Sequence, residues 1–104
     1  MRFTKIGKWW GKSNNLTTEI DVVALDEKNN SAVFAECKWR NKAPTIQDLI
    51  NLKNKTQYVE WRKNERTEKL VFFTKTNPDN KTLEYAKQNQ IQIIGLKELK
   101  EKMN

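Results

Sequence analysis

Two apolar stretches on either side of a short polar segment predict a β-hairpin. EIDVVAL (residues 19–25) is dense in β-branched residues, and AVFAECKW (residues 32–39) resumes the apolar pattern after the polar segment DEKNNS. Asn29 and Asn30 suit the left-handed backbone angles of a tight two-residue turn. We therefore expect these two stretches to form the first two strands of a sheet, after an irregular, glycine-containing start.

The remainder of the chain alternates between helical and extended patterns. Thr45 is a candidate N-cap with Asp48 three positions later, and apolar residues then recur at helical spacing. The unbroken apolar run KLVFFT predicts a strand that is buried on both faces. After the hairpin, the expected elements are a helix from 45 to about 61, strand 69–74, a helix over about 80–89, strand 91–96 and a short helix from about 97.

This order of elements, β-β-α-β-α-β-α, predicts an α/β fold. The hairpin strands are antiparallel, whereas the later strands are joined through helices. The sheet is therefore expected to be mixed and four-stranded, with helices on both faces.

The length of the chain is that of one domain. It has 104 residues, and no repeat or linker-like segment divides it, so residues 1–104 are expected to form a single domain. No stretch approaches the roughly 18 apolar residues that are needed to span a bilayer. The N-terminus lacks the apolar run of a signal peptide, so we expect a cytoplasmic protein with no membrane partner.

Composition narrows the chemistry that this chain could perform. It contains no histidine, which excludes Ser-His-Asp and Cys-His nucleophilic schemes as well as histidine-ligated metals. Its one cysteine, Cys37, excludes an internal disulfide and a zinc site built from several thiolates. We expect Cys37 to be a small buried residue. Catalysis would have to use carboxylates, lysines, water and a hard cation that is held by oxygen ligands.

The formal net charge of +7 favours a polyanionic partner, and DNA is the partner that we expect. An equally open alternative is that lysine-rich faces only keep the protein soluble. Trp9 and Trp10 lie in the basic N-terminal segment; they could stack on bases, although aromatic residues beside a first strand more often close the edge of a core. The residues expected to contact nucleic acid are Lys5, Lys8, Lys12, Arg40 and Lys42.

Acidic and basic side chains share one face of the predicted hairpin. Side chains alternate across a strand, so Glu36 and Lys38 lie on the same face. With a two-residue turn, the expected cross-strand pairs are Asp21 with Lys38, Val23 with Glu36 and Glu19 with Arg40. Asp21 and Glu36 then become diagonal neighbours about 7 Å apart. A four-residue loop is expected to keep the same register, whereas a three-residue loop would turn Asp21 to the opposite face.

Two carboxylates in this position repel each other unless a divalent cation lies between them. Mg²⁺ suits the arrangement because it binds one or two protein carboxylates together with waters and phosphate oxygens. Such a cation could polarise a phosphodiester and acidify its own water, and Lys38 could orient that water or stabilise charge in the transition state. Two alternatives stay open: Glu36 and Lys38 form only an exposed ion pair, and Glu19 is either a further metal ligand or a solvated residue at the strand end.

Several segments resemble a known group of proteins. An acid, a hairpin and then ECK within an apolar strand are similar to the PD-(D/E)xK nuclease superfamily, which includes restriction endonucleases and archaeal Holliday-junction resolvases. The segments IGKWW, EIDVVAL, AECKW, KLVFFTKT and IQIIGL more closely resemble the nuclease-like domain of unknown function at the C-terminus of archaeal-type ATPases. The resemblance covers nearly the whole chain and implies a restriction endonuclease-like fold.

The resemblance also implies roles for individual residues. Asp21 and Glu36 would bind Mg²⁺ or Mn²⁺, and Lys38 would assist the attacking water. Gln47, at the start of the following helix, would be a catalytic glutamine that faces the site, or else an exposed helix residue. The chain departs from the superfamily in having no acid before Glu19, and it lacks the Gly-x-x-x-x-Gly-Lys-Ser/Thr loop of an ATPase.

The expected function is that of a metal-dependent DNA endonuclease domain, a hydrolase that cleaves phosphodiester bonds by direct attack of water in DNA repair, recombination or defence. One alternative is a catalytically inactive nuclease-fold module that binds DNA or docks to an ATPase partner. Another is a structural domain for protein–protein contact. Besides DNA, an ATPase domain or subunit and a second copy of the chain in a homodimer are the partners left open.

Overall fold

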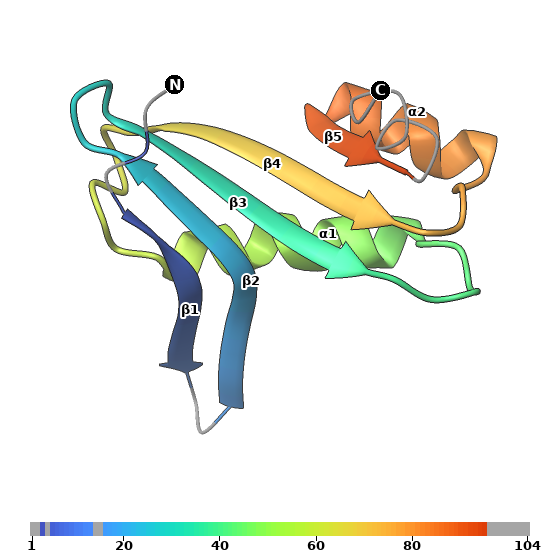
Figure 1. Ribbon diagram of the computed structural model, residues 1–104, viewed down its shortest axis with the longest axis horizontal. Helices are drawn as coiled ribbons and strands as arrows, with labels where there is room; N and C mark the ends of the chain where they lie inside the picture. The colour runs from blue at the N-terminus through green and yellow to red at the C-terminus, as the bar shows by residue number, and fades with distance from the viewer. Residues whose placement is uncertain (1–2, 4, 14–15, 96–104) are drawn as a thin grey trace.

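The computed structural model describes residues 3, 5–13 and 16–95, and describes the side chains of these residues except 10–13 and 16–19. The described elements form one mixed sheet and two α-helices (Figure 1). The strands are β1 (Lys5–Ser13), β2 (Leu16–Asp26), β3 (Ser31–Lys38), β4 (Thr67–Thr74) and β5 (Ile91–Ile94). The helical elements are α1 (Ile46–Lys55), the short 3₁₀ turn η1 (Thr56–Tyr58) and α2 (Asn80–Gln88).

The five described strands lie in chain order, β1-β2-β3-β4-β5. β1, β2 and β3 are antiparallel neighbours, whereas β4 pairs parallel to β3 and β5 pairs parallel to β4. The sheet is mixed and the class is α/β, but the predicted four strands are wrong. The N-terminal segment adds a fifth strand, β1, along the free edge of β2.

β1 forms where the glycines suggested an irregular start. Gly7 has an ordinary backbone conformation, because none of the described glycines has a positive φ, and open space surrounds the position that a Cβ atom would take. The residue therefore marks no turn. Trp9 packs against the main core from this strand, which agrees with the core-edge interpretation of the tryptophans. The side chain of Trp10 lies outside the described residues.

Both described α-helices begin at side-chain caps. Thr45 Oγ1 accepts the N–H of Asp48 at 3.2 Å, and Asp48 Oδ2 accepts the N–H of Thr45 at 2.9 Å, so the predicted capping box is confirmed. At the start of α2, the carboxylate of Asp79 accepts the N–H of Thr82 at 2.8 Å. No helix in the described part of the chain is long and apolar enough to cross a membrane. The third predicted helix, from about residue 97, lies outside the described residues.

The predicted end of the first helix near residue 61 is wrong, because α1 ends at Lys55 and η1 follows it. A distant side chain holds the chain in this non-helical path. The guanidinium group of Arg66 donates hydrogen bonds of 2.7–2.8 Å to the carbonyl oxygens of Thr56, Val59 and Trp61. These carbonyls are therefore satisfied without further helical turns.

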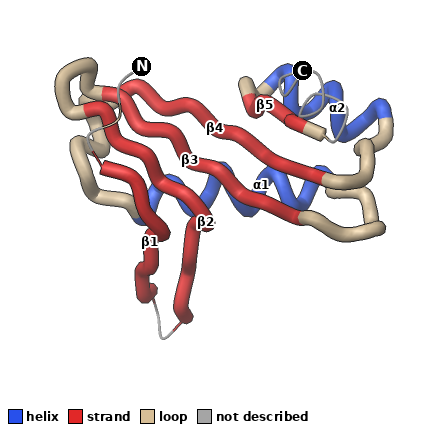
Figure 2. The backbone as a smooth tube through the Cα atoms, in the orientation of Figure 1, coloured by secondary structure: helices blue, strands red, loops and turns tan. Residues whose placement is uncertain are grey.

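Both described α-helices pack on the same face of the sheet, and Figure 2 shows α1 crossing behind the strands. The largest fully buried apolar side chains of this main core are Ile20, Phe34, Leu49, Leu52 and Phe72. The opposite face carries a smaller cluster of Ala35, Val71 and Ile94 beside an open apolar groove. No described helix covers that second face, so the prediction of helices on both faces is wrong for the described residues.

The interior strand β4, which lies between β3 and β5, is buried on both faces, as its unbroken apolar run predicted. Leu70 and Phe72 belong to the main core, and Val71 belongs to the cluster on the other face. Parallel strands in the middle of a sheet lose contact with solvent on both sides, which favours such continuous apolar runs.

Candidate functional site

The hairpin between β2 and β3 closes through a four-residue turn, residues 27–30, with Asp26 paired to Ser31. The buried carboxylate of Asp26 accepts the N–H of Asn29 at 3.1 Å and its side-chain amide at 2.7 Å. Asn30 has a φ of 56°, so the left-handed conformation expected in this turn is found at one of the two asparagines. The Asp26 hydrogen bonds thus favour a longer turn than the predicted two-residue loop.

The longer turn shifts the strand register by two residues from the one predicted. Val23 lies opposite Phe34, and the ladder that begins at Asp26 and Ser31 ends with Val22 opposite Ala35. The predicted cross-strand pairs are therefore wrong: Asp21 with Lys38, Val23 with Glu36 and Glu19 with Arg40. A shift by an even number of residues does not itself move a side chain to the other face. Alternation is nevertheless interrupted between Ile20 and Val23, which both pack in the main core although they are three residues apart.

β2 carries a β-bulge at Asp21 and Val22, in its pairing with β1. The β1–β2 register shifts by one residue between Gly7 and Trp9. Asp21 and Val22 of β2 therefore both lie opposite Lys8 of β1. Beyond this point, β1 and the first half of β2 turn away from β3 (Figure 1). Bulges bend a strand and re-aim its side chains, and this one places Asp21 where the two strands part.

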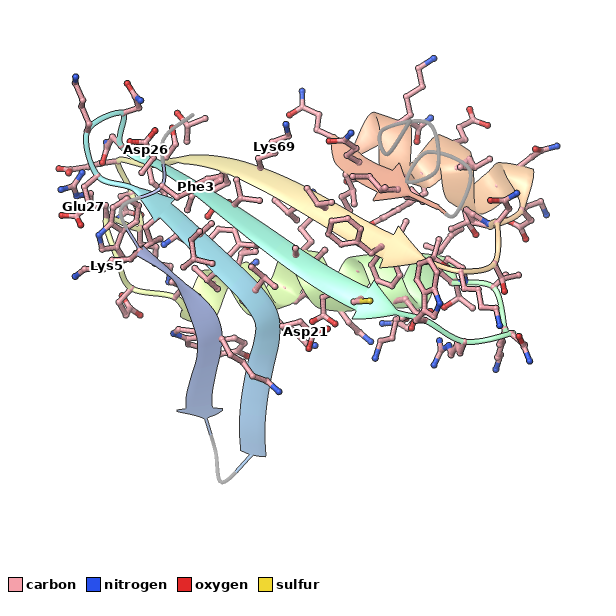
Figure 3. The ribbon with its side chains drawn as sticks, in the orientation of Figure 1. Phe3, Lys5, Asp21, Asp26, Glu27 and Lys69 are labelled. Carbon is pink, nitrogen blue, oxygen red and sulfur yellow. The ribbon has the colours of Figure 1, made fainter. Side chains whose placement is uncertain are left out.

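The carboxylate of Asp21 takes over one hydrogen bond of the ladder. Its Oδ2 atom accepts the N–H of Cys37 at 2.9 Å, just beyond the last backbone pair. Figure 3 shows Asp21 projecting from the bend of β2 on the side of β3. The bond holds the Asp21 carboxylate at the backbone of β3, one residue after Glu36. The other carboxylate oxygen of Asp21, Oδ1, forms no hydrogen bond within the described residues.

Glu36 is a buried carboxylate with one described partner. The residue is 4% exposed, and Lys55 Nζ donates a hydrogen bond to its Oε1 atom at 2.5 Å. Burial of a carboxylate is costly unless the charge is paired, and this charge-assisted bond provides the pairing. Every buried side-chain nitrogen and oxygen of the described residues has a partner. Oε2 of Glu36 forms no such bond, so this atom is reached by solvent.

Lys55 is the residue at this site that sequence reasoning missed. It lies in the last turn of α1 together with Lys53, and its side chain is 26% exposed. No local pattern distinguishes Lys55 from Lys53, the other lysine of α1. Only the packing of α1 against the sheet brings it to Glu36, so the ion pair of Glu36 forms with Lys55 and not with Lys38.

Lys38 lies at the end of β3, opposite Thr74 of β4, and is half-buried. Alternation along β3 places it on the same side as Glu36. It forms no hydrogen bond or ion pair with any described residue. Its ammonium group is therefore available to a ligand at this edge of the sheet.

Gln47 is not brought to the carboxylates. It is exposed in the first turn of α1, where its Nε2 atom donates to Asn51 Oδ1 at 2.9 Å, and it lines a groove with Asp79 at the start of α2. The helix reaches Glu36 through Lys55, two turns further along. A catalytic role for Gln47 stays a prediction, and these contacts do not support it.

Two other expectations concern Glu19 and Cys37. The side chain of Glu19 lies outside those described, so its role as a metal ligand stays a prediction. Cys37 is exposed, and the expectation of a small buried residue is wrong. It lies on the second face of the sheet, which no described helix covers. Within the described residues, no three acidic, cysteine or histidine side chains form a group that could hold a metal ion.

The basic residues fall into two groups. Lys5 and Lys8 are exposed on β1, and the side chain of Lys12 lies outside those described. Arg40 and Lys42 are exposed in the loop after β3, where Arg40 Nη2 lies 3.3 Å from Asp48 Oδ2.

Lys75, which sequence reasoning did not single out, adds a further positive charge beside this loop, from the segment that follows β4. β3 and β4 are parallel, so the residues that follow them lie at the same edge of the sheet. Lys75 Nζ donates to Asn41 Oδ1 at 3.0 Å, and Thr76 Oγ1 donates to the carbonyl of Arg40 at 2.9 Å. Lys38, Arg40, Lys42 and Lys75 together form what we name the basic edge.

Comparison with known proteins places the chain among proteins without an established activity. The DUF234 family of archaeal and bacterial proteins of unknown function matches residues 1–57. The uncharacterized protein MJECL04 of Methanocaldococcus jannaschii is 40% identical over 40 residues, which are 38% of this chain and 8% of that protein. The crystal structure of the protein of unknown function AF1548 is similar with a TM-score of 0.62 and 22% identity.

That structural similarity covers 88% of this chain and 48% of AF1548, and it shows a shared fold. The chain thus spans about half of the solved structure and a small part of the Methanocaldococcus protein. The DUF234 match covers more than half of the 104 residues. The chain therefore belongs to the DUF234 family of archaeal and bacterial proteins of unknown function.

Proposed function

We propose that this domain is a metal-dependent DNA endonuclease that holds a divalent cation between Asp21 and Glu36. The observation that carries the proposal is the hydrogen bond from the N–H of Cys37 to Asp21 at 2.9 Å. This bond holds the carboxylate of Asp21 against the backbone of β3, one residue after Glu36, at the place where the strands separate. The resemblance of the hairpin to the PD-(D/E)xK nucleases supports the same assignment.

The donor set fits a hard cation. Oδ1 of Asp21 and Oε2 of Glu36 are carboxylate oxygens without hydrogen bonds to described residues, and Mg²⁺ and Mn²⁺ prefer oxygen ligands. Mg²⁺ commonly binds one or two protein carboxylates and keeps several of its waters, so two acids are sufficient. When bound, the cation would polarise a phosphate oxygen and lower the pKa of a water.

The remaining polar groups suit a phosphodiester substrate. Lys38 Nζ would donate hydrogen bonds to the attacking water or to a phosphate oxygen, and its positive charge would stabilise the charge that develops in the transition state. Residues of the basic edge, Arg40, Lys42 and Lys75, would contact neighbouring phosphates of the DNA backbone. The sequence carries no histidine, so the carboxylates, lysines and water would perform all proton transfers.

A second candidate function is favoured by the environment of Glu36. This residue is 4% exposed and one of its oxygens already binds the ammonium group of Lys55. A nuclease-fold module without hydrolytic activity, which binds DNA through the basic edge or docks to an ATPase domain or subunit, would retain such an ion pair as a structural feature.

Cleavage assays separate the two candidates. Purified protein is incubated with branched, linear and single-stranded DNA in Mg²⁺ or Mn²⁺, beside the variants Asp21→Asn, Glu36→Gln and Lys38→Met. The nuclease proposal requires metal-dependent cleavage that each substitution reduces by at least about 100-fold. Lys63→Ala, at an exposed position in the turn before β4, serves as the control and should cleave like the wild type. Salt-sensitive DNA binding without cleavage in either metal would support the inactive module.

A further inference from the structure

Lys55 supplies the carboxylate site with a positive charge from the protein itself. Its Nζ atom lies 2.5 Å from Oε1 of Glu36, and it is the described partner that compensates the burial of this carboxylate. We propose that Lys55 is a resident counter-ion, and that a divalent cation binds at Asp21 and Glu36 by displacing its ammonium group. This inference rests on the proposed function and concerns how the same site is loaded.

The distances make the two cations competitors. Carboxylate oxygens coordinate Mg²⁺ at roughly 2.1 Å, and the ammonium group lies 2.5 Å from Oε1 of Glu36. A cation bound to Oε2 would therefore share one carboxylate with the ammonium group. Positive charges held this close to each other at a largely buried carboxylate repel strongly. A cation that binds between Asp21 and Glu36 would therefore weaken or break the bond to Lys55.

Lys55 is the movable partner of the pair. Its side chain is 26% exposed and lies in the last turn of α1, where the negative end of the helix dipole and solvent both favour a free ammonium group. Glu36, in contrast, is anchored on β3, which pairs with β2 on one side and β4 on the other. The lysine can thus move away while the carboxylate keeps its position.

Calorimetric titration with Mn²⁺ tests the competition. We compare the wild type with Lys55→Met and with the control Lys53→Met, which removes the same charge from the same helical turn. Lys53 Nζ binds the side-chain oxygen of Asn89 and contacts neither carboxylate by hydrogen bond or ion pair. Lys55→Met should bind Mn²⁺ at least about tenfold more tightly than the wild type, because the cation no longer displaces a charge-assisted hydrogen bond. Lys53→Met should bind Mn²⁺ like the wild type.

Two further measurements keep the test decisive if Lys55→Met folds poorly without metal. In the wild type, the ¹⁵N NMR signal of the Lys55 ammonium group should shift on addition of Mg²⁺, while that of Lys53 should stay in place. The double variant Glu36→Gln/Lys55→Met, in which both charges of the pair are removed, should fold and should bind no Mn²⁺. An unchanged Lys55 signal at saturating Mg²⁺ would overturn the proposal.

The outcomes for the two proposals are distinguishable. Equal Mn²⁺ affinities of the wild type and Lys55→Met would overturn the counter-ion role and leave the metal site intact. Failure of every variant to bind Mn²⁺ would overturn the metal site and, with it, this inference. Tighter binding by Lys55→Met without DNA cleavage by any variant would support the inference and contradict the proposed nuclease activity.

Discussion

The carboxylate of Asp21 and the backbone N–H of Cys37 form a 2.9 Å hydrogen bond that replaces one step of the β2–β3 ladder. The backbone pairs end at Val22 and Ala35, and the bulge in β2 carries the strand away from β3 beyond them. A side chain thus extends the pairing of two strands whose backbones have parted. The same carboxylate is one of the two proposed metal ligands. Its role in strand pairing can be tested by protein stability, and its role in metal binding by calorimetry.

Asp21→Asn should preserve stability and abolish metal binding. The amide oxygen of asparagine still accepts the N–H of Cys37, so the free energy of unfolding in urea should stay within about 0.5 kcal/mol of the wild type. Asp21→Ala removes the acceptor and should cost about 1 kcal/mol. Neither variant should show saturable Mn²⁺ binding by calorimetry. Equal stability losses for the two variants would mean that this hydrogen bond does not hold the strands together.

Glu36→Ala should destabilise the protein by about 2 kcal/mol. It leaves the Lys55 ammonium group without its partner, and the cost is smaller than for a fully buried pair because Lys55 is 26% exposed. The double variant Glu36→Leu/Lys55→Met replaces both charges by apolar groups and should recover most of this loss. Urea denaturation of the single and double variants measures the coupling. Strictly additive losses would show that the ion pair contributes no coupling energy.

Arg66→Lys should cost about 3 kcal/mol of stability. The side chain of Arg66 is 1% exposed, and its guanidinium group donates to three carbonyl oxygens while it lies 5.0 Å from the ring centre of Phe34. The single ammonium group of lysine cannot reproduce this planar set of donors, so buried carbonyls lose their partners. Lys63→Ala, in the exposed turn nearby, should change the free energy of unfolding by less than about 0.5 kcal/mol.

Asp79 should make the start of α2 sensitive to acid. Hydrogen bonds from the backbone and side chain of Thr82, with a smaller contribution from Lys81, lower the pKa of Asp79 below its ordinary value of 3.8. Because the folded pKa is depressed, the stabilising effect is complete above the unfolded pKa and is lost as the pH falls through the folded pKa. Asn at this position caps the helix without titrating.

Urea unfolding from neutral pH down to about pH 2 tests this prediction on the wild type and Asp79→Asn. The wild type should lose stability relative to the variant only in the acidic part of this range. A constant difference between the two proteins at every pH would contradict the assigned role of Asp79.

Lys75→Ala should weaken DNA binding without changing its sequence preference. Lys75 is exposed at the basic edge, where it would contact a phosphate. Loss of one phosphate contact should reduce the slope of log K against log salt concentration by about 1. The control is Lys87→Ala, which removes an equal charge from the last turn of α2, away from the basic edge. It should leave the slope unchanged. Fluorescence anisotropy at several salt concentrations measures both variants, and identical slopes would exclude the basic edge as the DNA-binding surface.

Features that depend on residues close together in the sequence could be predicted from the sequence. The capping box of Thr45 and Asp48, the burial of β4 on both faces and the left-handed Asn30 all follow from local patterns. Alternation along the strands also predicted that Asp21 and Glu36 share a side of the sheet. The even register shift does not overturn this expectation, but the bulge interrupts the alternation at Asp21, so the shared side stays a prediction.

Features that depend on distant contacts could not be predicted in this way. β1 forms because its backbone pairs with that of β2, although its glycines resemble those of a loop. The end of α1 depends on Arg66, which follows the helix by ten or more residues. The partner of Glu36 is Lys55, nineteen residues further along the chain.

The amino-acid sequence by itself thus determined which segments become strands and helices in the middle of the chain. Only the tertiary structure decided that a bulge places Asp21 against the N–H of Cys37, and that a helix brings an ammonium group to Glu36. The physical reason is that a buried charge takes its partner from whichever element packs nearest in space. That element is selected by the burial of apolar faces, and no short sequence pattern records it.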